Sequence, residues 1–324
     1  MRPTFLARLV NGTLFDPVVF VRLLNQGRAI LFDCGRTGAL SNREILSLDE
    51  VFISHPHMDH LMGLDQVLRV ILHRRQPMHL YGPEGITDKV ISRLASYTWN
   101  LTRDYSFAFV LHEVREREIL TSTARACEGF QRSQAVISVR HGATIASHPR
   151  YSVDAVILDH NIKCLGFVIR EPFHVNIRGD AVSKRGYRKG PWISELKDCL
   201  MKGGREGHLL VETQAGPREI EVSELADELV VTSSGQKIAY VTDIRYSEEN
   251  IARIAGIAQG ADVLFIEAYY LSEREAQAYE KAHLTARQAG SLARMLSAKK
   301  VVPMHISPRY HDRAEEVLLE LEGV

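Results

Sequence analysis

A seven-residue run of the chain concentrates side chains that bind metal ions. Residues 54–60 read Ser-His-Pro-His-Met-Asp-His, and neutral imidazole is a good ligand for zinc and similar ions, with carboxylate oxygens completing such sites. In an extended or turning backbone, His55 and His57 point to the same side and can bind one ion. Asp59 and His60 fall at the start of the following helix, where they can turn toward a second ion. The run therefore predicts a metal site with places for two ions.

Metal-competent or acid–base residues also follow several aliphatic runs that have the character of buried strands. Polar residues at adjacent strand ends can converge on one site at a sheet edge, which is where rigid scaffolds usually place chemistry. Any one of these residues could serve only as a hydrogen-bonded structural residue, but their repetition favours a common site. The runs are 51–53 before His55, 156–158 before Asp159 and His160, 238–242 before Asp243, 263–266 before Glu267, and 301–304 before His305.

The elements that must carry these residues alternate between β-rich runs and helical periodicity. Residues 18–24 and 29–32, joined by a turn at 25–27, are typical of a hairpin. Apolar residues at helical spacing over 61–74 predict a helix directly after the metal-binding run. Two sheets with helices on their outer faces satisfy the whole order, so we predict an α/β fold. Further strands are expected at 51–53, 78–81, 237–241, 263–266 and 301–304, and further helices from 88, at 286–296 and at 314–321.

Composition and charge narrow the class of protein. With 324 residues, of which 45% are hydrophobic and 25% charged, the chain can bury a sizeable globular core. The formal net charge is zero, so a nucleic acid would have to be captured by a local basic patch. The four cysteines are scattered, and no apolar run reaches the roughly 20 residues of a membrane span. We interpret the protein as cytoplasmic, without disulfides, a membrane span or a signal peptide.

One region lacks the periodicity of a packed core. Apolar spacing is weak between Pro172 and His208, and long stretches of this kind inside a compact domain are often functional or mobile. Within it, residues 192–200 are expected to form one short helix after Pro191. The alternative interpretation is a solvated surface loop. The region carries the basic residues Arg178, Lys184, Arg185, Arg188, Lys189, Lys197, Lys202 and Arg205.

The chain resembles the metallo-β-lactamase superfamily, and more narrowly the ribonuclease Z family of tRNA 3′-processing endonucleases. The His-x-His-x-Asp-His loop marks the superfamily, whereas Glu267, His283 and the Ser-Pro-Arg-Tyr segment at 307–310 favour the ribonuclease Z branch. The resemblance implies one four-layer αββα domain over 1–324, with an inserted flexible basic arm at 173–207. The matching segments are 31–35, 54–64, 81–83, 158–160, 165–167, 242–243, 267–268, 283–285 and 305–310.

The resemblance also implies a cofactor. Two zinc ions are expected, with manganese or iron as the alternative metals. One ion would be held by His55, His57 and His160, the other by Asp59, His60 and His305, and Asp243 would bridge both.

Catalytic and phosphate-binding roles follow from the same resemblance. Asp59 would orient the attacking water, and His283, held by Glu267, would protonate the leaving group, which suits an imidazole with a carboxylate partner. Ser307 and Arg309 would lie near the substrate phosphate. The implied enzyme is an endoribonuclease, a metal-dependent hydrolase that removes 3′ trailers from tRNA precursors.

The basic arm fits this substrate. Family members of this type grip the body of tRNA with a flexible arm that contains a Gly-Pro pair. Gly190 and Pro191, flanked by Arg188 and Lys189, resemble that feature. The resemblance further implies a homodimer in which each arm reaches tRNA held by the other subunit.

The chain departs from the family pattern at three places, which keeps other functions open. In the family an acidic residue often follows the Asp-Cys-Gly segment, and here that position is Arg36. The residue before the catalytic glutamate is commonly histidine, and here it is Ile266. The family usually has a Gly-Thr-Gly loop near its amino terminus, and here only Asn11-Gly12-Thr13 is present. The first alternative is another hydrolase on this fold, acting on a cyclic nucleotide or small phosphodiester, an aryl sulfate or a thioester. A di-iron redox protein is disfavoured by His57, which such proteins typically replace with an acidic residue. A non-catalytic RNA-binding module is disfavoured because every predicted ligand is present.

Overall fold

The structure is a computed structural model that describes residues 4–24 and 26–323. The described chain forms two compact units. The body comprises Phe5–Ile145, Val153–Ile169 and the chain from Lys237 onward, and the inserted unit comprises Arg170–Gln236 with Ala146–Ser152 and Thr4. The arm predicted at 173–207 lies within the inserted unit, which continues to Gln236.

The first half of the body forms an eight-stranded sheet whose strand order follows the chain. The sheet is antiparallel at both ends, whereas β3, β4, β5 and β6 run parallel. The parallel centre brings the carboxyl ends of β3, β4 and β5 to one edge of the sheet. The strands are β1 (Phe5–Leu9), β2 (Val19–Leu23), β3 (Arg28–Phe32), β4 (Leu48–Phe52), β5 (Met78–Pro83), β6 (Ala108–Val114), β7 (Glu118–Arg125) and β8 (Val136–Val139).

The second sheet has six strands in the order β18-β17-β16-β11-β10-β9. Its strands β16, β17 and β18 are parallel and in close register, with Val241 opposite Ile266 and Ile266 opposite Pro303. Their carboxyl ends therefore lie side by side. The strands are β9 (Thr144–Ser147), β10 (Ser152–Asp159), β11 (Lys163–Arg170), β16 (Lys237–Val241), β17 (Val263–Glu267) and β18 (Val301–Met304).

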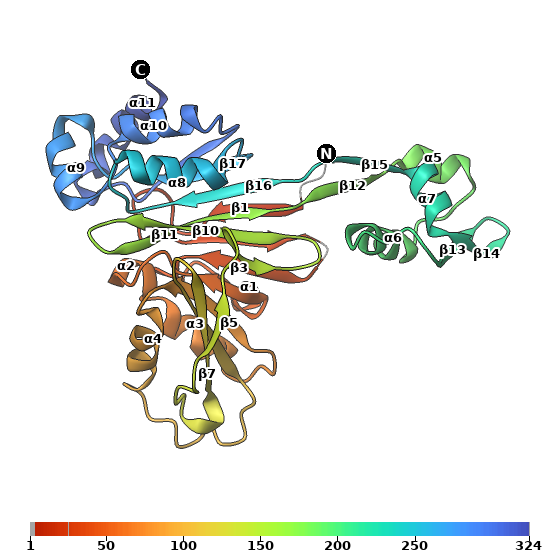
Figure 1. Cartoon of the computed structure of the whole chain (residues 1–324), viewed down its shortest axis with the longest axis horizontal. Helices are drawn as coiled ribbons and strands as arrows, with labels where there is room; N and C mark the ends of the chain where they lie inside the picture. The colour runs from red at the N-terminus through yellow and green to blue at the C-terminus, as the bar shows by residue number, and fades with distance from the viewer. Residues whose placement is uncertain (1–3, 25, 324) are drawn as a thin grey trace. The chain divides into compact units, whose positions relative to one another are not determined.

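Helices cover the outer faces of both sheets of the body (Figure 1). On the eight-stranded sheet, α1 (Asn42–Leu46), α3 (Leu64–Ile71) and α4 (Ile86–Leu94) pack their buried apolar residues onto β3, β4 and β5. On the six-stranded sheet, α8 (Glu248–Ala258), α10 (Ala286–Met295) and α11 (Ala314–Glu322) do the same. The body is thus the four-layer αββα sandwich expected from the order of elements.

Aromatic rings fill the space between the two sheets. Phe32 of β3 stacks on Tyr240 of β16 at 5.5 Å between ring centroids and on Phe167 of β11 at 5.6 Å. Phe52 of β4 contacts Phe32 and Phe167 and stacks on Tyr81 of β5 at 4.8 Å. These rings are nearly all fully buried and each large side chain removes much apolar area from water, so the sheets are held at a fixed separation. The edges of the two sheets that carry the polar residues are therefore also fixed relative to each other.

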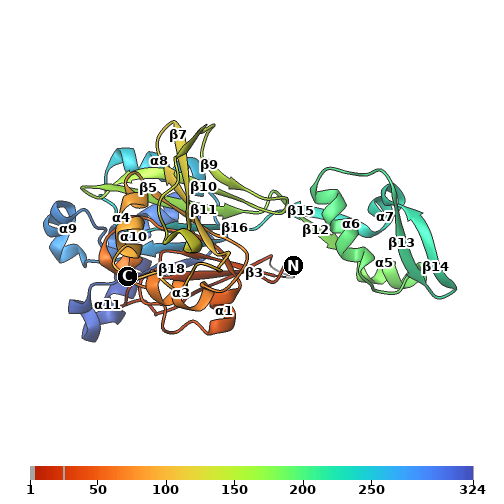
Figure 2. The ribbon, with the colours of Figure 1, turned by 90° about the horizontal axis from the view of Figure 1, so that it is seen from below.

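The inserted unit has elements and a small core of its own (Figure 2). The chain leaves along β12 and returns along the antiparallel β15, so Phe173 and Ser234 are paired. Between them lie helices that enclose Val182, Trp192, Leu196, Val211, Val222, Leu225 and Leu229. The elements are β12 (Phe173–Ile177), α5 (Gly179–Lys184), α6 (Trp192–Met201), β13 (His208–Thr213), β14 (Gly216–Glu221), α7 (Val222–Leu229) and β15 (Val230–Ser234).

Most predicted elements are confirmed, with two differences. The helix expected over 61–74 is confirmed as α3 (Leu64–Ile71), but it begins after Gly63, and Leu61 instead ends a separate short helix, α2 (Met58–Leu61). A Cβ at Gly63 would lie 2.0 Å from the carbonyl oxygen of Gly35, so the close approach of two backbones sets this break. The second difference concerns residues 172–208, which were expected to lack a packed core but contribute to one in the inserted unit. The helix predicted at 192–200 within this stretch is confirmed as α6. The predicted turn at 25–27 includes Asn25, which lies outside the described residues.

Candidate metal centre

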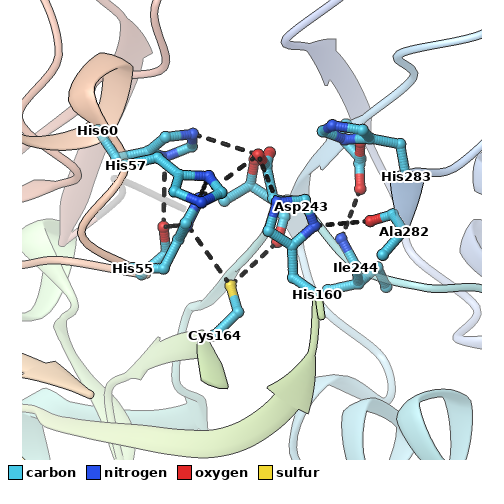
Figure 3. A network of polar contacts seen from close by, with 12 residues as sticks. His55, His57, His60, His160, Cys164, Asp243, Ile244, Ala282 and His283 are labelled. Atoms are coloured by element: carbon cyan, nitrogen blue, oxygen red, sulfur yellow. Dashed lines mark hydrogen bonds and ion pairs between the residues drawn. The ribbon is translucent and has the colours of Figure 1, made fainter. Parts of the chain in front are cut away.

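The strand ends of the two sheets bring the predicted site residues together at one edge of the body (Figure 3). His55 and His57 lie in the loop after β4, and Asp59 and His60 lie in α2, for which His57 is the N-cap. Because β16, β17 and β18 are parallel and in register, the residues that follow them share one edge. The second sheet contributes His160 after β10, Asp243 after β16, Glu267 at the end of β17 and His305 after β18.

A first group of ligand atoms gathers around one oxygen of Asp243. Asp243 Oδ2 lies 3.6 Å from Nε2 of His55 and 3.6 Å from Nε2 of His160. His57 completes the group, with its Nδ1 2.8 Å from His55 Nε2. The ligand atoms of these four residues all lie within 4.8 Å of one another. This is the set predicted for the first ion, and its assignment as a ligand set stays a prediction.

A second group lies on the other side of Asp243. His60 Nε2 is 3.4 Å from Asp243 Oδ2 and 3.5 Å from Asp59 Oδ2. His305 Nε2 is 3.2 Å from Asp59 Oδ2, and its Nδ1 is 2.6 Å from Asp243 Oδ1. Asp243 therefore contacts members of both groups, as expected of a bridging carboxylate. A third combination, in which Glu267 and His283 join Asp243 and His305, also has its ligand atoms within 4.8 Å of one another.

The charges of this centre shift the pKa values of its imidazoles in opposite directions. Burial and then the neighbouring His60 lower the pKa of His55 well below its ordinary value. Burial also works to lower the pKa of His305, but the Asp243 carboxylate outweighs it and raises that pKa to about 10. The pKa of His60 is likewise raised well above its ordinary value, because Asp243 and Asp33 outweigh burial. Carboxylates that favour a proton on these rings equally favour a metal cation in its place.

Asp33, for which the sequence predicted no role, orients His60. Its Oδ2 lies 2.7 Å from Nδ1 of His60 and accepts hydrogen bonds from the hydroxyls of Ser54 at 2.7 Å and Tyr240 at 2.5 Å. Its Oδ1 accepts from the backbone N–H of Ser54 at 2.6 Å. All four groups are fully buried. Since Asp33 holds Nδ1, the Nε2 of His60 is directed toward Asp243 and Asp59. Asp33 follows β3 directly, so the strand-end pattern used for the other residues was a signal that could have found it.

His160 and His283 are held in the same manner. His160 Nδ1 donates to the carbonyl of Ala282 at 2.7 Å, which leaves Nε2 facing Asp243. His283 Nδ1 lies 2.8 Å from Glu267 Oε2, and Glu267 Oε1 accepts from the backbone N–H of Ile244 at 2.7 Å. Burial works to lower the pKa of His283, but the Glu267 carboxylate outweighs it and raises that pKa. The Glu267–His283 pair predicted from the sequence is thus in hydrogen-bonding contact.

Two features of these side chains fit bound cations. His60 Nε2 is buried and has no hydrogen-bond partner, although carboxylate oxygens surround it. His55 Nε2 and His57 Nδ1 face each other at 2.8 Å, and two imidazole lone pairs do so only around a shared proton or cation. Imidazole nitrogens and carboxylate oxygens in these numbers suit zinc or a similar transition metal.

Three residues of the centre have left-handed backbone conformations, which residues other than glycine rarely adopt. The φ angles are 56° at Asp33, 48° at Asp243 and 53° at His305. Each residue directly follows or nearly follows a strand, so the left-handed turn redirects its side chain from the strand toward the site. Backbone strain of this kind tends to cluster at functional sites.

Comparison with known proteins places this centre in a family. A family model described as "Beta-lactamase superfamily domain" matches residues 211–306, and one described as "Anti-Pycsar protein Apyc1" matches residues 19–163. The ribonuclease Z of Deinococcus radiodurans is 30% identical to the chain over 87% of this chain and 83% of its own length. The chain belongs to the ribonuclease Z family. A ribonuclease Z of Bacillus cereus (strain B4264) is 26% identical over 96% of this chain and 89% of its own length.

Solved structures show the same fold. The short form of human tRNase Z aligns with a TM-score of 0.52 at 18% identity, covering 94% of this chain and 93% of that one. The metallo-β-lactamase fold protein YhfI of Bacillus subtilis aligns with a TM-score of 0.53 at 13% identity, covering 98% and 91%. As a member of the ribonuclease Z family with the metallo-β-lactamase fold, the protein is a metal-dependent hydrolase. Among the helices of the described residues, none has the length and apolar character needed to cross a bilayer.

The remaining residues predicted from the family resemblance fall in two places. Ser307 and Arg309 follow β18 beside the metal centre, and Arg309 Nε donates to Ser307 Oγ at 3.2 Å. Arg188, Lys189 and Pro191 are exposed in the inserted unit, just before α6. Gly190 lies against the indole of Trp192, whose Nε1 donates to the Arg188 carbonyl at 2.9 Å.

Proposed function

We propose that this ribonuclease Z family member removes 3′ trailers from tRNA precursors with two zinc ions. The observation that carries the proposal is the Glu267–His283 hydrogen bond beside two groups of ligand atoms that share Asp243. That arrangement joins a proton donor to a centre for two cations, which is the equipment needed to cleave a phosphodiester. A ribonuclease Z at 30% identity and the fold of human tRNase Z support RNA as the substrate.

The side chains of the centre support zinc as the metal. His55, His57 and His160 would hold one ion, Asp59, His60 and His305 the other, and Asp243 both. When bound, such ions lower the pKa of a water molecule and neutralise charge on the phosphate oxygens. The protein supplies the orientation: Asp33 fixes His60 and the Ala282 carbonyl fixes His160, so the Nε2 atoms of both rings are directed toward Asp243.

The chain's own residues move the protons. Asp59 is partly exposed, and although burial works against it, hydrogen bonds with His305 and His60 lower its pKa, which keeps it an acceptor. With Nδ1–H donated to Glu267, the second proton of the protonated His283 imidazole would reside on Nε2. That proton would pass to the departing 3′ oxygen of the RNA. The raised pKa of His283 favours the protonated form that this step requires.

Substrate binding would use two sets of residues. Ser307 and Arg309 would bind the phosphate at the cleavage point, where Arg309 offers a fixed fork of donors. The exposed Arg188 and Lys189, with Gly190 and Pro191, would bind the body of the tRNA. Proteins recognise A-form RNA mainly by shape and phosphate contacts, so few base-specific contacts are needed. We also propose a homodimer in which the inserted unit of one subunit binds tRNA that the other subunit cleaves.

The decisive experiment is incubation of purified, zinc-loaded protein with a 3′-extended tRNA, followed by mapping of the cut. Cleavage at the 3′ end of the tRNA body is expected, with loss of activity on chelation. Bis(p-nitrophenyl) phosphate, a cyclic nucleotide and a thioester are assayed beside it. Efficient turnover of one of these, with no cleavage of the RNA, would instead support the alternative of a small-molecule hydrolase.

A variant separates the proton donor from the ligands. His283→Ala should slow RNA cleavage by roughly 10²-fold or more while the zinc content stays unchanged. Zinc is measured by mass spectrometry on the purified variant. Loss of zinc in His283→Ala would show that this ring is a ligand, as the third group of nearby ligand atoms would allow.

A further inference from the structure

Tyr269 lies two residues beyond the end of β17 and covers one face of the His283 ring. The two rings are stacked, with centroids 4.1 Å apart and an angle of 12° between planes. We propose that Tyr269 is a positioning residue that fixes the orientation of the His283 imidazole for proton transfer to the leaving oxygen. This inference rests on the proposed function of His283 as the proton donor.

The parallel contact distinguishes Tyr269 from the other rings near His283. His160 meets the imidazole at 66° and 4.9 Å, Tyr270 at 66° and 6.1 Å, and His305 at 68° and 5.9 Å. These contacts are T-shaped, so none of these three rings lies parallel to the imidazole. Of the aromatic contacts to His283 among the described residues, the one with Tyr269 is parallel, so this ring blocks tilting of the imidazole toward its own side.

Glu267 and Tyr269 act on His283 in complementary directions. The hydrogen bond from Nδ1 to Glu267 fixes one ring atom but leaves the imidazole free to pivot about that bond. A pivot would swing Nε2 away from the reacting phosphate, and displacement of a catalytic group by about 1 Å can reduce the rate by roughly 10²-fold. The stacked phenol ring opposes the pivot. One strand end therefore supplies both restraints.

Tyr269 is itself held in place from the substrate side. Its backbone carbonyl accepts a hydrogen bond from the Ser307 N–H at 3.2 Å. Ser307 in turn accepts from Arg309 Nε at 3.2 Å. Tyr270 and His305 make T-shaped contacts with the phenol ring, with centroids at 4.9 Å and 5.1 Å. The residues proposed to bind the phosphate thus contact, through Tyr269, the residue proposed to protonate the leaving group.

The test compares two substrates that differ in their need for a proton. The RNA leaves through a 3′ oxygen that must be protonated, whereas bis(p-nitrophenyl) phosphate releases an anion that is stable without a proton. Tyr269→Leu and Tyr269→Thr remove the ring with two different side chains, and Tyr269→Phe keeps the ring without the hydroxyl. Tyr97→Leu, an exposed tyrosine in the turn after α4, is the matched control. Folding is checked by circular dichroism and zinc by mass spectrometry.

The expected result is a selective loss. Tyr269→Leu and Tyr269→Thr should lower kcat for the RNA by at least about tenfold, with KM, zinc content and hydrolysis of bis(p-nitrophenyl) phosphate unchanged. Tyr269→Phe should retain most of the RNA activity, and Tyr97→Leu all of it. Equal losses on both substrates, a loss of zinc, or full RNA activity without the ring would each overturn the positioning role.

His283→Ala, assayed on the same pair, separates the two hypotheses. A loss confined to the RNA supports His283 as the proton donor on which the role of Tyr269 rests. Equal loss on both substrates would remove that assignment from the proposed function. If His283→Ala shows the selective loss and the two ring-free variants do not, the proton donor stands and the inference about Tyr269 alone fails.

Discussion

The metal centre of the body and the basic segment of the inserted unit place their functional residues under opposite conditions. His55, His60 and Asp243 are almost completely buried and hydrogen-bonded or ion-paired on several sides. Arg188 and Lys189 are exposed, next to a helix that covers a small separate core. Bond cleavage needs ligand atoms fixed to fractions of an ångström, whereas attraction of a polyanion needs accessible charge.

The largest effect is expected where both ligand groups meet. Asp243→Asn keeps the shape of the side chain, and asparagine tolerates the left-handed backbone at this position, so the body should fold. The variant loses the charge shared by both groups, and we expect zinc binding to fail and hydrolysis of every substrate to fall by roughly 10²–10³-fold or more.

Zinc content and activity on bis(p-nitrophenyl) phosphate measure this outcome. Asp180→Asn, an exposed aspartate of α5, is the control and should keep both. An Asp243→Asn protein that binds metal as the parent protein does would show that the two ligand groups do not depend on a shared carboxylate.

Removal of the inserted unit should affect the cleavage of a tRNA precursor but not the hydrolysis of bis(p-nitrophenyl) phosphate. Phe173 and Ser234 are directly paired in β12 and β15, so a two-residue Asn-Gly turn can join them and replace 174–233. The shortened protein should fold and hydrolyse bis(p-nitrophenyl) phosphate as before, because the ligand atoms all come from the body. Cleavage of the tRNA precursor should be abolished. Equal loss on both substrates would refute a role for this unit in binding RNA.

Asp33→Asn tests whether the buried hydrogen bonds of Asp33 hold His60 in the orientation that binds metal. The amide can no longer accept all four contacts made to the carboxylate, so His60 loses its fixed orientation. Zinc affinity should fall by roughly 10–100-fold, measured by competition with a chelator. Tyr240→Phe removes one of the donors to Asp33 and should produce a smaller loss. Unchanged affinity in both variants would mean that the ligands orient only when the metal binds.

The smallest effect is expected from single charges of the inserted unit. Arg188→Ala and Lys189→Ala should each weaken binding of tRNA and reduce the slope of log affinity against log salt by about 1. Hydrolysis of the small diester should not change. Binding is measured over a series of salt concentrations, with Lys300→Ala, an exposed lysine of the body, as the control. Slopes equal to that of the parent protein would place the phosphate contacts elsewhere.

The site was more accessible to sequence reasoning than the inserted unit, for a physical reason. Short aliphatic runs ending in His160, Asp243, Glu267 and His305 are a local pattern, and parallel strands bring such ends to one edge without further information. Asp33 has the same local pattern but stands apart from the family's ligands, so its partners were visible only in the structure. The stacking of Tyr269 on His283 depends on the exact path of the chain after β17 and leaves no periodic signal.

The core of the inserted unit was missed because its apolar residues are few and far apart. Val182, Trp192, Val211 and Leu225 meet from four different elements, none longer than ten residues. Periodicity is informative only over windows of about 11–18 residues, so each element alone is too short to reveal its buried face. The weak apolar periodicity of this region is real, but its separate apolar residues nevertheless pack into one core.

The left-handed backbone at Asp33, Asp243 and His305 sets a limit on how this enzyme can adapt to heat. Each of these conformations disfavours the folded chain, and glycine would relieve the backbone strain at Asp243 and His305 while removing the side chains that form the centre. At Asp33, glycine would also leave the hydroxyls of Ser54 and Tyr240 without their acceptor. A search for thermostable variants that ignored activity would therefore be drawn toward inactive proteins at these positions. Variants that become more robust while remaining active must improve elsewhere, in the aromatic layer between the sheets or on the helices that cover them.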